Sequence, residues 1–168
     1  RPRGVEPDRG GESRIAKTTD FENFKDVWAV QKSDYNSASI EKSTLKRGKD
    51  GRWRYFTSFV APEDGRWCTT INTADSIEAL DPANTKRLFT ATDHNLEGVK
   101  DPWLMEVDGT YHLFLSVAIN TASTSDSSHE SLDIFNTGEC KSATALATST
   151  DLDNWDWQGI VLQPEGDT

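Results

Sequence analysis

Two carboxylates in this chain stand at the start of predicted β-strands, where the backbone can hold a side chain in one orientation. Asp101 lies between Lys100 and Pro102, and Glu41 begins the corresponding run earlier in the chain. A carboxylate fixed in this way can accept hydrogen bonds from hydroxyl groups or exchange a proton. Each also has a structural interpretation. Asp101 would cap a turn before proline, and Glu41 would join a salt bridge or lie at a rim, which is the favoured interpretation for Glu41.

Two further side chains near Asp101 could contact a ligand. Trp103 follows on the same predicted strand and offers a ring for stacking, but a core position is more common for such a tryptophan and is expected here. His94 lies in a polar linker, where a histidine is usually just exposed. Cys68 and Cys140 form no CxxC pattern and no histidine cluster accompanies them. We therefore expect two free thiols, no metal site and no cofactor.

Three segments with a common pattern indicate that the chain is built from repeats. Each has a Thr or Ser, then an Asp, then an apolar or aromatic residue, in Ala16–Phe24, Ile71–Ile77 and Ala147–Trp155. Their aspartates are 55 and then 76 residues apart, and the polar stretch 120–141 accounts for the longer second spacing. A period near 55 residues suits one blade of a β-propeller.

A second pair of repeated segments predicts the strands within each blade. Asp50-Gly51 and Asp108-Gly109 are predicted to be two-residue hairpin turns, because glycine adopts positive φ without steric cost. A short inner strand precedes each turn, at Ile40–Leu45 and Val99–Val107, and an aromatic-rich strand follows it. A third strand ends at the repeated aspartate and an outer strand follows. One unit is therefore four antiparallel strands.

These patterns predict an all-β chain, a β-propeller of four-stranded antiparallel blades of the five-bladed type, with about two and a half blades present. Residues 1–34 are expected to form a partial blade, 35–95 a complete blade, and 96–168 a complete blade with the polar insertion 120–141. Closed propellers have four to eight blades. We expect a piece of a longer chain that pairs with the remainder of the propeller or with a second copy, because unpaired strand edges associate.

The composition argues against several classes of partner. The chain has 28 acidic and 18 basic residues and a net charge of −10, so we expect no nucleic acid and no anionic membrane surface. No run of about 18 apolar residues is present, so no membrane span is expected. The acids are spread along the chain, which indicates a solvated surface or, alternatively, adaptation to high salt. No signal peptide is visible, and the location stays open, with secretion favoured.

The segment Gly98–Ser116 resembles the inner hairpin of five-bladed β-propeller glycosidases, which carries Asp-Pro and then Asp-Gly-x-Tyr. These enzymes are the arabinanases and xylosidases of glycoside hydrolase family 43 and the related invertases and fructosidases of family 32. Ala147–Trp155 resembles their third strand, A-T-S-x-D-L-x-x-W. The resemblance covers residues 14–163 as architecture. The sialidase Asp-box fits less well, because its tryptophan stands seven residues after the serine, one more than here.

The resemblance implies hydrolysis of a furanoside or plant-type polysaccharide by paired carboxylates, one protonated and one ionised. It implies that Asp101 is a third carboxylate that orients the carbohydrate, with Lys100 where family 32 has an arginine. Lys100, His94 and Trp103 would contact the carbohydrate ligand. The base would lie before residue 1 and the acid after residue 168, since Glu41 precedes Asp101, the wrong order for the acid. The alternative is a non-catalytic propeller that binds carbohydrate or another protein.

The direction of the strands places the insertion. If Asp101 starts its strand at the mouth of the central funnel, the Asp108-Gly109 turn lies at the far end and the connection after Ser116 returns to the mouth. The insertion 120–141 is then expected to overhang Asp101, where a long loop can gate or select a ligand. Alternatively it is a disordered polar excursion, since Ser123–Ser128 has nothing to bury.

Overall fold

The computed structural model describes residues 10–165, which form β-strands and short 3-10 helices and no α-helix. The strands are β1 (Glu12–Lys17), β2 (Lys25–Gln31), β3 (Ile40–Arg47), β4 (Trp53–Val60), β5 (Trp67–Ala74), β6 (Lys86–Phe89), β7 (Gly98–Val107), β8 (Thr110–Ile119), β9 (Lys141–Ser149) and β10 (Asp156–Leu162). The 3-10 helices are η1 (Lys32–Tyr35), η2 (Ile77–Ala79), η3 (Pro82–Asn84), η4 (Thr92–His94), η5 (Asp126–His129) and η6 (Ile134–Asn136). The predicted all-β class is confirmed.

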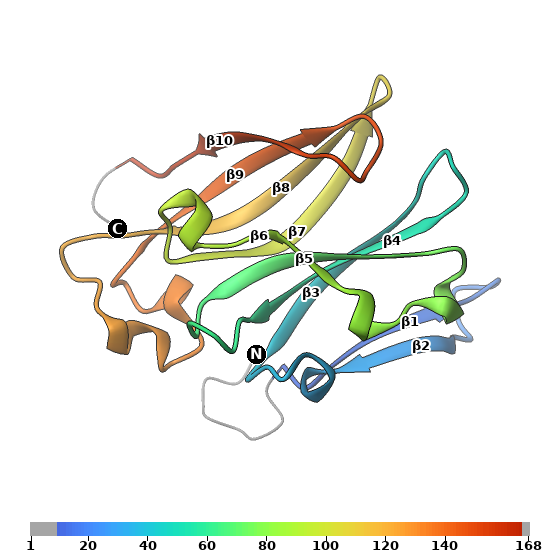
Figure 1. The fold of residues 1–168 in the computed structure, drawn as a ribbon, viewed down its shortest axis with the longest axis horizontal. Helices are drawn as coiled ribbons and strands as arrows, with labels where there is room; N and C mark the ends of the chain where they lie inside the picture. Colours follow the sequence, from blue (N-terminus) through green and yellow to red (C-terminus); the bar gives the residue numbers. More distant parts are fainter. Residues whose placement is uncertain (1–9, 166–168) are drawn as a thin grey trace.

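Two four-stranded antiparallel blades make up most of the fold (Figure 1). The first has the order β3-β4-β5-β6 and the second the order β7-β8-β9-β10. β1 and β2 form a separate two-stranded sheet, as the third and outer strands of a further blade would. This arrangement confirms the predicted propeller architecture. The residues 1–9 and 166–168, which the prediction assigned to the first and last blades, lie outside the described residues.

The main core lies between the two blades. Along β8, Tyr111, Leu113, Leu115 and Val117 are buried and alternate with less buried residues, the pattern of a strand with one covered face. This face joins one apolar cluster with residues of the first blade, among them Phe56. The corresponding positions of β9 are alanines, which let the blades approach closely.

A single backbone pair joins the blades at the ends where β5 and β7 begin. Trp67 and Gly98 are parallel partners there, so the two blades form one continuous sheet that splays apart beyond this point. Figure 1 shows the second blade diverging from the first toward its Asp-Gly turn. The radial spread of blades from their inner strands is the geometry expected of a propeller.

The two Asp-Gly turns differ from each other. Both residues of Asp108-Gly109 have positive φ, 49° and 80°, and form the predicted two-residue hairpin turn. The prediction is wrong for Asp50-Gly51, which belongs to a three-residue loop. The backbone N–H of Gly48 donates to the carbonyl of Arg52 at 2.8 Å, so three residues stand between them. Glycine still supplies the positive φ, 82°, that closes this loop.

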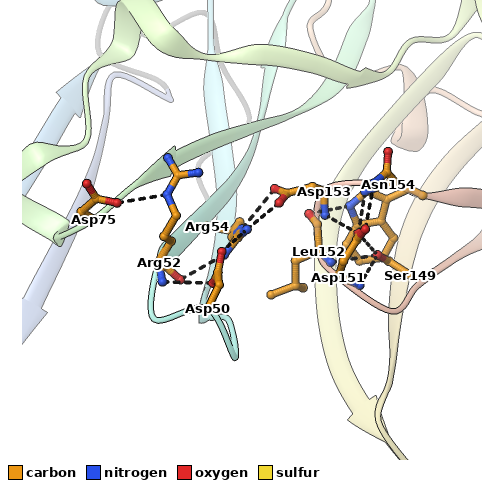
Figure 2. A network of polar contacts seen from close by, with 10 residues as sticks. Asp50, Arg52, Arg54, Asp75, Ser149, Asp151, Leu152, Asp153 and Asn154 are labelled. Carbon is orange, nitrogen blue, oxygen red and sulfur yellow. Dashed lines mark hydrogen bonds and ion pairs between the residues drawn. The ribbon is translucent and has the colours of Figure 1, made fainter.

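The repeated aspartate of the second blade organises the turn between β9 and β10 (Figure 2). The Oδ1 atom of Asp151 accepts hydrogen bonds from the backbone N–H groups of Asp153 and Asn154, at 2.9 and 2.8 Å. Ser149 Oγ accepts the N–H of Leu152 at 2.9 Å. The hydrogen bonds that Asn154 and Asp153 donate to the ionised carboxylate hold the pKa of Asp151 well below its usual range.

The first copy of the repeat forms the same turn, but the apolar side chain in it is exposed instead of buried. Asp20 accepts the N–H groups of Glu22 and Asn23 at 3.0 and 2.8 Å. Phe21 and Leu152 occupy the same position in their turns, with φ of 60° and 70°. Leu152 is buried in the core between the blades, whereas Phe21 is 86% exposed. The turn therefore presents one apolar side chain, and the neighbouring blade decides whether it is covered.

Arg54 ties the two blades together (Figure 2). It lies at the start of β4, whereas Ser58, the hydrogen-bond partner of Asp101, lies near the end of that strand. The Arg54 side chain is 1% exposed, and Nη1 and Nη2 donate to the two carboxylate oxygens of Asp50 at 2.5 and 2.8 Å. Nε and Nη2 also donate to Asp153 at 3.2 and 2.6 Å. Such charge-assisted, bidentate pairs are strong and directional. The β3–β4 loop is thereby fixed to the β9–β10 turn.

We predict that Arg54→Met lowers the free energy of unfolding by about 2 kcal/mol. The change leaves Asp50 and Asp153 facing each other without a cation, and their partial exposure reduces the loss below that of a fully buried pair. Urea unfolding measures the difference. The matched control is Arg52→Met, which removes an exposed pair with Asp75 and should change the free energy by less than about 0.5 kcal/mol. Equal effects of the two substitutions would contradict the role given to Arg54.

The contribution of Asp50 is expected to depend on pH. Its hydrogen bond with Arg54 lowers the pKa of Asp50 from 3.8 to about 2. A lowered pKa in the folded state stabilises the fold above the unfolded pKa, and this contribution disappears as the pH falls through the folded pKa. The stability difference between the wild type and Arg54→Met should therefore shrink from pH 4 to pH 2. Urea unfolding across this range tests it, and a constant difference would be evidence against the pair.

Candidate functional site

Asp101 occupies a bulge close to the start of β7. The pairing of β7 with β8 shifts between Lys100 and Trp103, and Asp101 has a φ of 57°, in the left-handed region. Its backbone N–H donates to Ser58 Oγ of the first blade at 3.0 Å. Non-glycine residues are uncommon at such φ values, although Asp and Asn are enriched among them. The bulge therefore fixes the direction of this carboxylate at some cost in backbone energy.

A cleft of about 480 Å³ opens beside Asp101. Its lining comes from the start of β7, the end of β8, the start of β9, helix η6, the end of β10 and the segment after it: Lys100, Asp101, Ser116, Phe135, Asn136, Ser142, Ala143, Thr144, Leu162, Gln163 and Pro164. The Oδ1 atom of Asp101 is buried and accepts no hydrogen bond within residues 10–165. A buried acceptor without a donor is costly, and such atoms in native proteins call for a functional explanation.

Glu41 and Lys100 form an ion pair next to this cleft. Lys100 Nζ lies 2.9 Å from Glu41 Oε2, and the two side chains are 8% and 6% exposed. The ammonium group also lies over the rings of Trp67 and Phe135, at 4.9 and 4.7 Å from their centroids. Glu41 thus has the salt bridge that its sequence context favours, and Lys100 stands between the carboxylate and the aromatic rings.

The ion pair joins equivalent positions of the two blades. Glu41 in β3 and Lys100 in β7 each lie opposite a serine of the following strand and directly before a bulge. The residue in the bulge is Lys42 in the first blade, with a φ of 23°, and Asp101 in the second. Of the two described blades, only the second therefore has a carboxylate at the bulge.

His94 and Trp103 lie away from the lining of the Asp101 cleft. The His94 ring stacks on Trp157 of β10, with 3.9 Å between ring centroids and an interplanar angle of 18°, and burial lowers its pKa. Trp103 is 59% exposed and lies beside Phe114, with 5.7 Å between ring centroids. The core position expected for Trp103 is therefore wrong, because no described segment covers this face of the second blade.

Glu97 anchors the insertion, a role that no local sequence signal revealed. Its side chain is 9% exposed, and Oε2 lies 3.2 Å from Arg66 Nη2 and 3.1 Å from His129 Nε2. Oε1 accepts a hydrogen bond from Asn120 at 3.1 Å. Ile134 within the insertion is fully buried. The insertion is therefore packed against the blades, and the alternative of a disordered excursion does not describe it.

No cluster of three or more His, Cys, Asp or Glu residues suited to a metal ion occurs in the described part of the chain. Cys68 and Cys140 are buried free thiols, and burial raises the pKa of Cys68 to about 12, which makes it unreactive near neutral pH. Between residues 10 and 165, no helix has the length and apolar character needed to cross a membrane.

No known protein family matches this chain, and no curated protein does. Among solved structures, a levansucrase variant from B. megaterium is similar, with a TM-score of 0.50 and 11% identity over 83% of this chain and 44% of the levansucrase. An exo-1,5-alpha-L-arabinanase from a bovine ruminal metagenomic library matches with 16% identity and a TM-score of 0.47, over 74% of this chain and 36% of the arabinanase. A thermostable family-43 glycoside hydrolase matches with 10% identity and a TM-score of 0.48, over 84% and 44%.

The likeness to the levansucrase concerns the fold, since the sequences share few residues. The chain spans less than half the length of each of these structures. Together with the blades described above, the match confirms the predicted resemblance at the level of architecture. The chain has a β-propeller fold, with two four-stranded blades and a separate two-stranded sheet in the described residues.

The conformation of Asp101 leads to a prediction on stability. We expect Asp101→Asn to keep the free energy of unfolding within about 0.5 kcal/mol, because Asn also tolerates left-handed φ. Asp101→Val should lower it by about 1–2 kcal/mol, because a branched Cβ is strained there. Urea unfolding of both variants measures the difference. Equal losses for Asn and Val would show that the bulge backbone does not set the preference at this position.

Proposed function

We propose that this chain is part of a carbohydrate-active β-propeller in which Asp101 binds hydroxyl groups of a furanoside or a plant-type polysaccharide. The observation that carries the proposal is the buried Oδ1 atom of Asp101, which has no donor and belongs to a residue lining a cleft. Asp101 as a whole is partly exposed at the cleft, so a sugar hydroxyl that reaches its carboxylate would supply the missing donor. Hydrogen bonds from hydroxyls to a carboxylate are among the stronger ones, at roughly 1.5–3 kcal/mol each.

The other groups of the cleft also suit a neutral polyhydroxylated ligand. Ser116, Ser142 and Thr144 carry hydroxyl groups, and Gln163 carries an amide, so the lining offers both donors and acceptors. An anionic ligand would meet the carboxylate of Asp101, and the chain carries a net charge of −10. These features support a carbohydrate and speak against a phosphate-rich partner.

The proposed reaction is hydrolysis of a glycosidic bond by paired carboxylates. It requires one protonated carboxyl group at the leaving oxygen and one ionised carboxylate on the opposite side. Glu41 is held by Lys100, so Asp101 is proposed as the third, substrate-orienting carboxylate. The acid and the base would come from other inner strands, supplied by the remainder of the propeller or by a second copy of the chain.

We predict that Asp101→Asn weakens binding or slows turnover of the carbohydrate by one to two orders of magnitude. The amide keeps the bulge conformation and loses the charge that strengthens the hydrogen bonds. Arabino-, xylo- and fructo-oligosaccharides are the probes, with calorimetry for binding and released reducing sugar for turnover. The matched control is Asp108→Asn, which also has positive φ but lies at the opposite end of β7.

The same experiment separates the possible outcomes. Binding that depends on Asp101 without any turnover would indicate a non-catalytic carbohydrate-binding propeller. If Asp101→Asn unfolds the protein while its remaining folded fraction binds as the wild type does, Asp101 is a structural turn residue. The proposed role would then be wrong.

A further inference from the structure

The insertion supplies one wall of the Asp101 cleft, and that wall has no counterpart in the first blade. The connection from β4 to β5 spans only residues 61–66, whereas the connection from β8 to β9 spans residues 120–140. Phe135 and Asn136 of the longer connection line the cleft together with Asp101. The rest of the lining comes from the strands of the second blade and from the segment after β10.

The Phe135 ring is held firmly in this wall. It packs on Gly98, where an added Cβ atom would lie only 3.0 Å from Phe135 Cε2. The ammonium group of Lys100 lies 4.7 Å from the ring centroid, and the Phe135 carbonyl accepts a hydrogen bond from Ser142 Oγ at 3.1 Å. Ile134, the preceding residue, is fully buried. A ring fixed in this way loses little entropy when it contacts a ligand.

The remainder of the insertion is anchored in the same rigid manner. Glu97 binds His129 and Asn120, which belong to two separate parts of the insertion. The indole N–H of Trp67 donates to the carbonyl of Leu132 at 3.3 Å. Contacts on both sides of η6 therefore fix its position relative to the start of β7, where Asp101 lies.

We propose that the η6 turn is a specificity element, with Phe135 as an apolar platform for a second sugar unit adjacent to the unit held by Asp101. This inference rests on the proposed function and extends it to the size of the ligand. A sugar ring has an apolar C–H face that packs on aromatic side chains, while its hydroxyl groups need polar partners. Asp101 serves the hydroxyl groups and Phe135 the apolar face. A cleft of about 480 Å³ is in the range that holds a ligand larger than one sugar unit. The site therefore selects oligosaccharides over monosaccharides.

The test compares monosaccharides with trisaccharides in calorimetric titrations. The probes are arabinose, xylose and fructose and the trisaccharide of each series. Phe135→Ala should weaken binding of the preferred trisaccharide about tenfold and change monosaccharide binding less than about twofold. Tenfold corresponds to about 1.4 kcal/mol, which is within the range of one aromatic contact. Phe135→Tyr keeps the ring and should bind nearly as the wild type does. Phe24→Ala, at an exposed phenylalanine in the turn between β1 and β2, is the matched control.

Two further measurements keep the test decisive if Phe135→Ala does not fold. Gly98→Ala leaves the ring present but pushes on it, and should also weaken trisaccharide binding. In the unsubstituted protein, the trisaccharide should shift the amide resonances of Phe135 and Asn136, and the monosaccharide should not. Absence of these shifts on trisaccharide binding would overturn the inference.

The results distinguish this inference from the proposed function. If Asp101→Asn weakens binding while Phe135→Ala binds like the wild type, the platform is wrong and the proposed function stands. If Phe135→Ala weakens binding of monosaccharides and trisaccharides equally, the selection by size is wrong. If the unsubstituted protein binds none of the probes, both the proposed function and the platform are wrong.

Discussion

The close contact between the two blades is the constraint on which the rest of this structure depends. The covered face of β8 packs on the first blade, and the alanines of β9 keep the two sheets close together. At that separation, Trp67 and Gly98 can pair through their backbones, and the N–H of Asp101 can reach Ser58 Oγ. The direction of the Asp101 carboxylate is therefore set by packing between the blades as well as by its own strand.

The polar groups at the two ends of the interface between the blades have different roles. At the end that carries the Asp-Gly loops, Arg54 has carboxylate partners on both blades and acts as a structural link. At the other end, Glu41 and Lys100 are paired, while Asp101 has a strained backbone and an unsatisfied oxygen. Stable proteins tolerate such local costs mainly at functional sites, because the surrounding structure compensates for them. The asymmetry itself distinguishes the candidate site from the linking end.

The sequence predicts the blades well because their signals are local. The repeat period, the alternation along β8 and the two positive φ values at Asp108-Gly109 all follow from neighbouring residues. The predicted turn at Asp50-Gly51 is one residue shorter than the observed loop. The length of the loop is set by the backbone hydrogen bond between Gly48 and Arg52 and not by the glycine alone. Asp-Pro at a strand start makes Asp101 a candidate, but the lack of a hydrogen-bond donor for its Oδ1 atom follows only from the placement of the blades.

The features that the sequence does not predict depend on residues far apart in the chain. One partner of Glu97, His129, is 32 residues away, and its position follows only from the folded insertion. His94 stacks on Trp157 of the outermost strand, which its polar linker does not suggest. The exposure of Trp103 depends on what covers the second blade rather than on its own strand pattern. Local patterns cannot encode such contacts, since each depends on the relative placement of whole elements.

The left-handed backbone at Asp101 has a consequence for how this protein can evolve. Asn and Gly are the other residues that adopt such a conformation readily, and each is one nucleotide away from an aspartate codon. Substitutions to most other residues would lower the stability of the fold as well as change the site. Homologues that do not need this carboxylate are therefore expected to carry Asn or Gly at this position and to keep the bulge. A lineage can in this way lose the carboxylate in one mutational step while its blades stay intact.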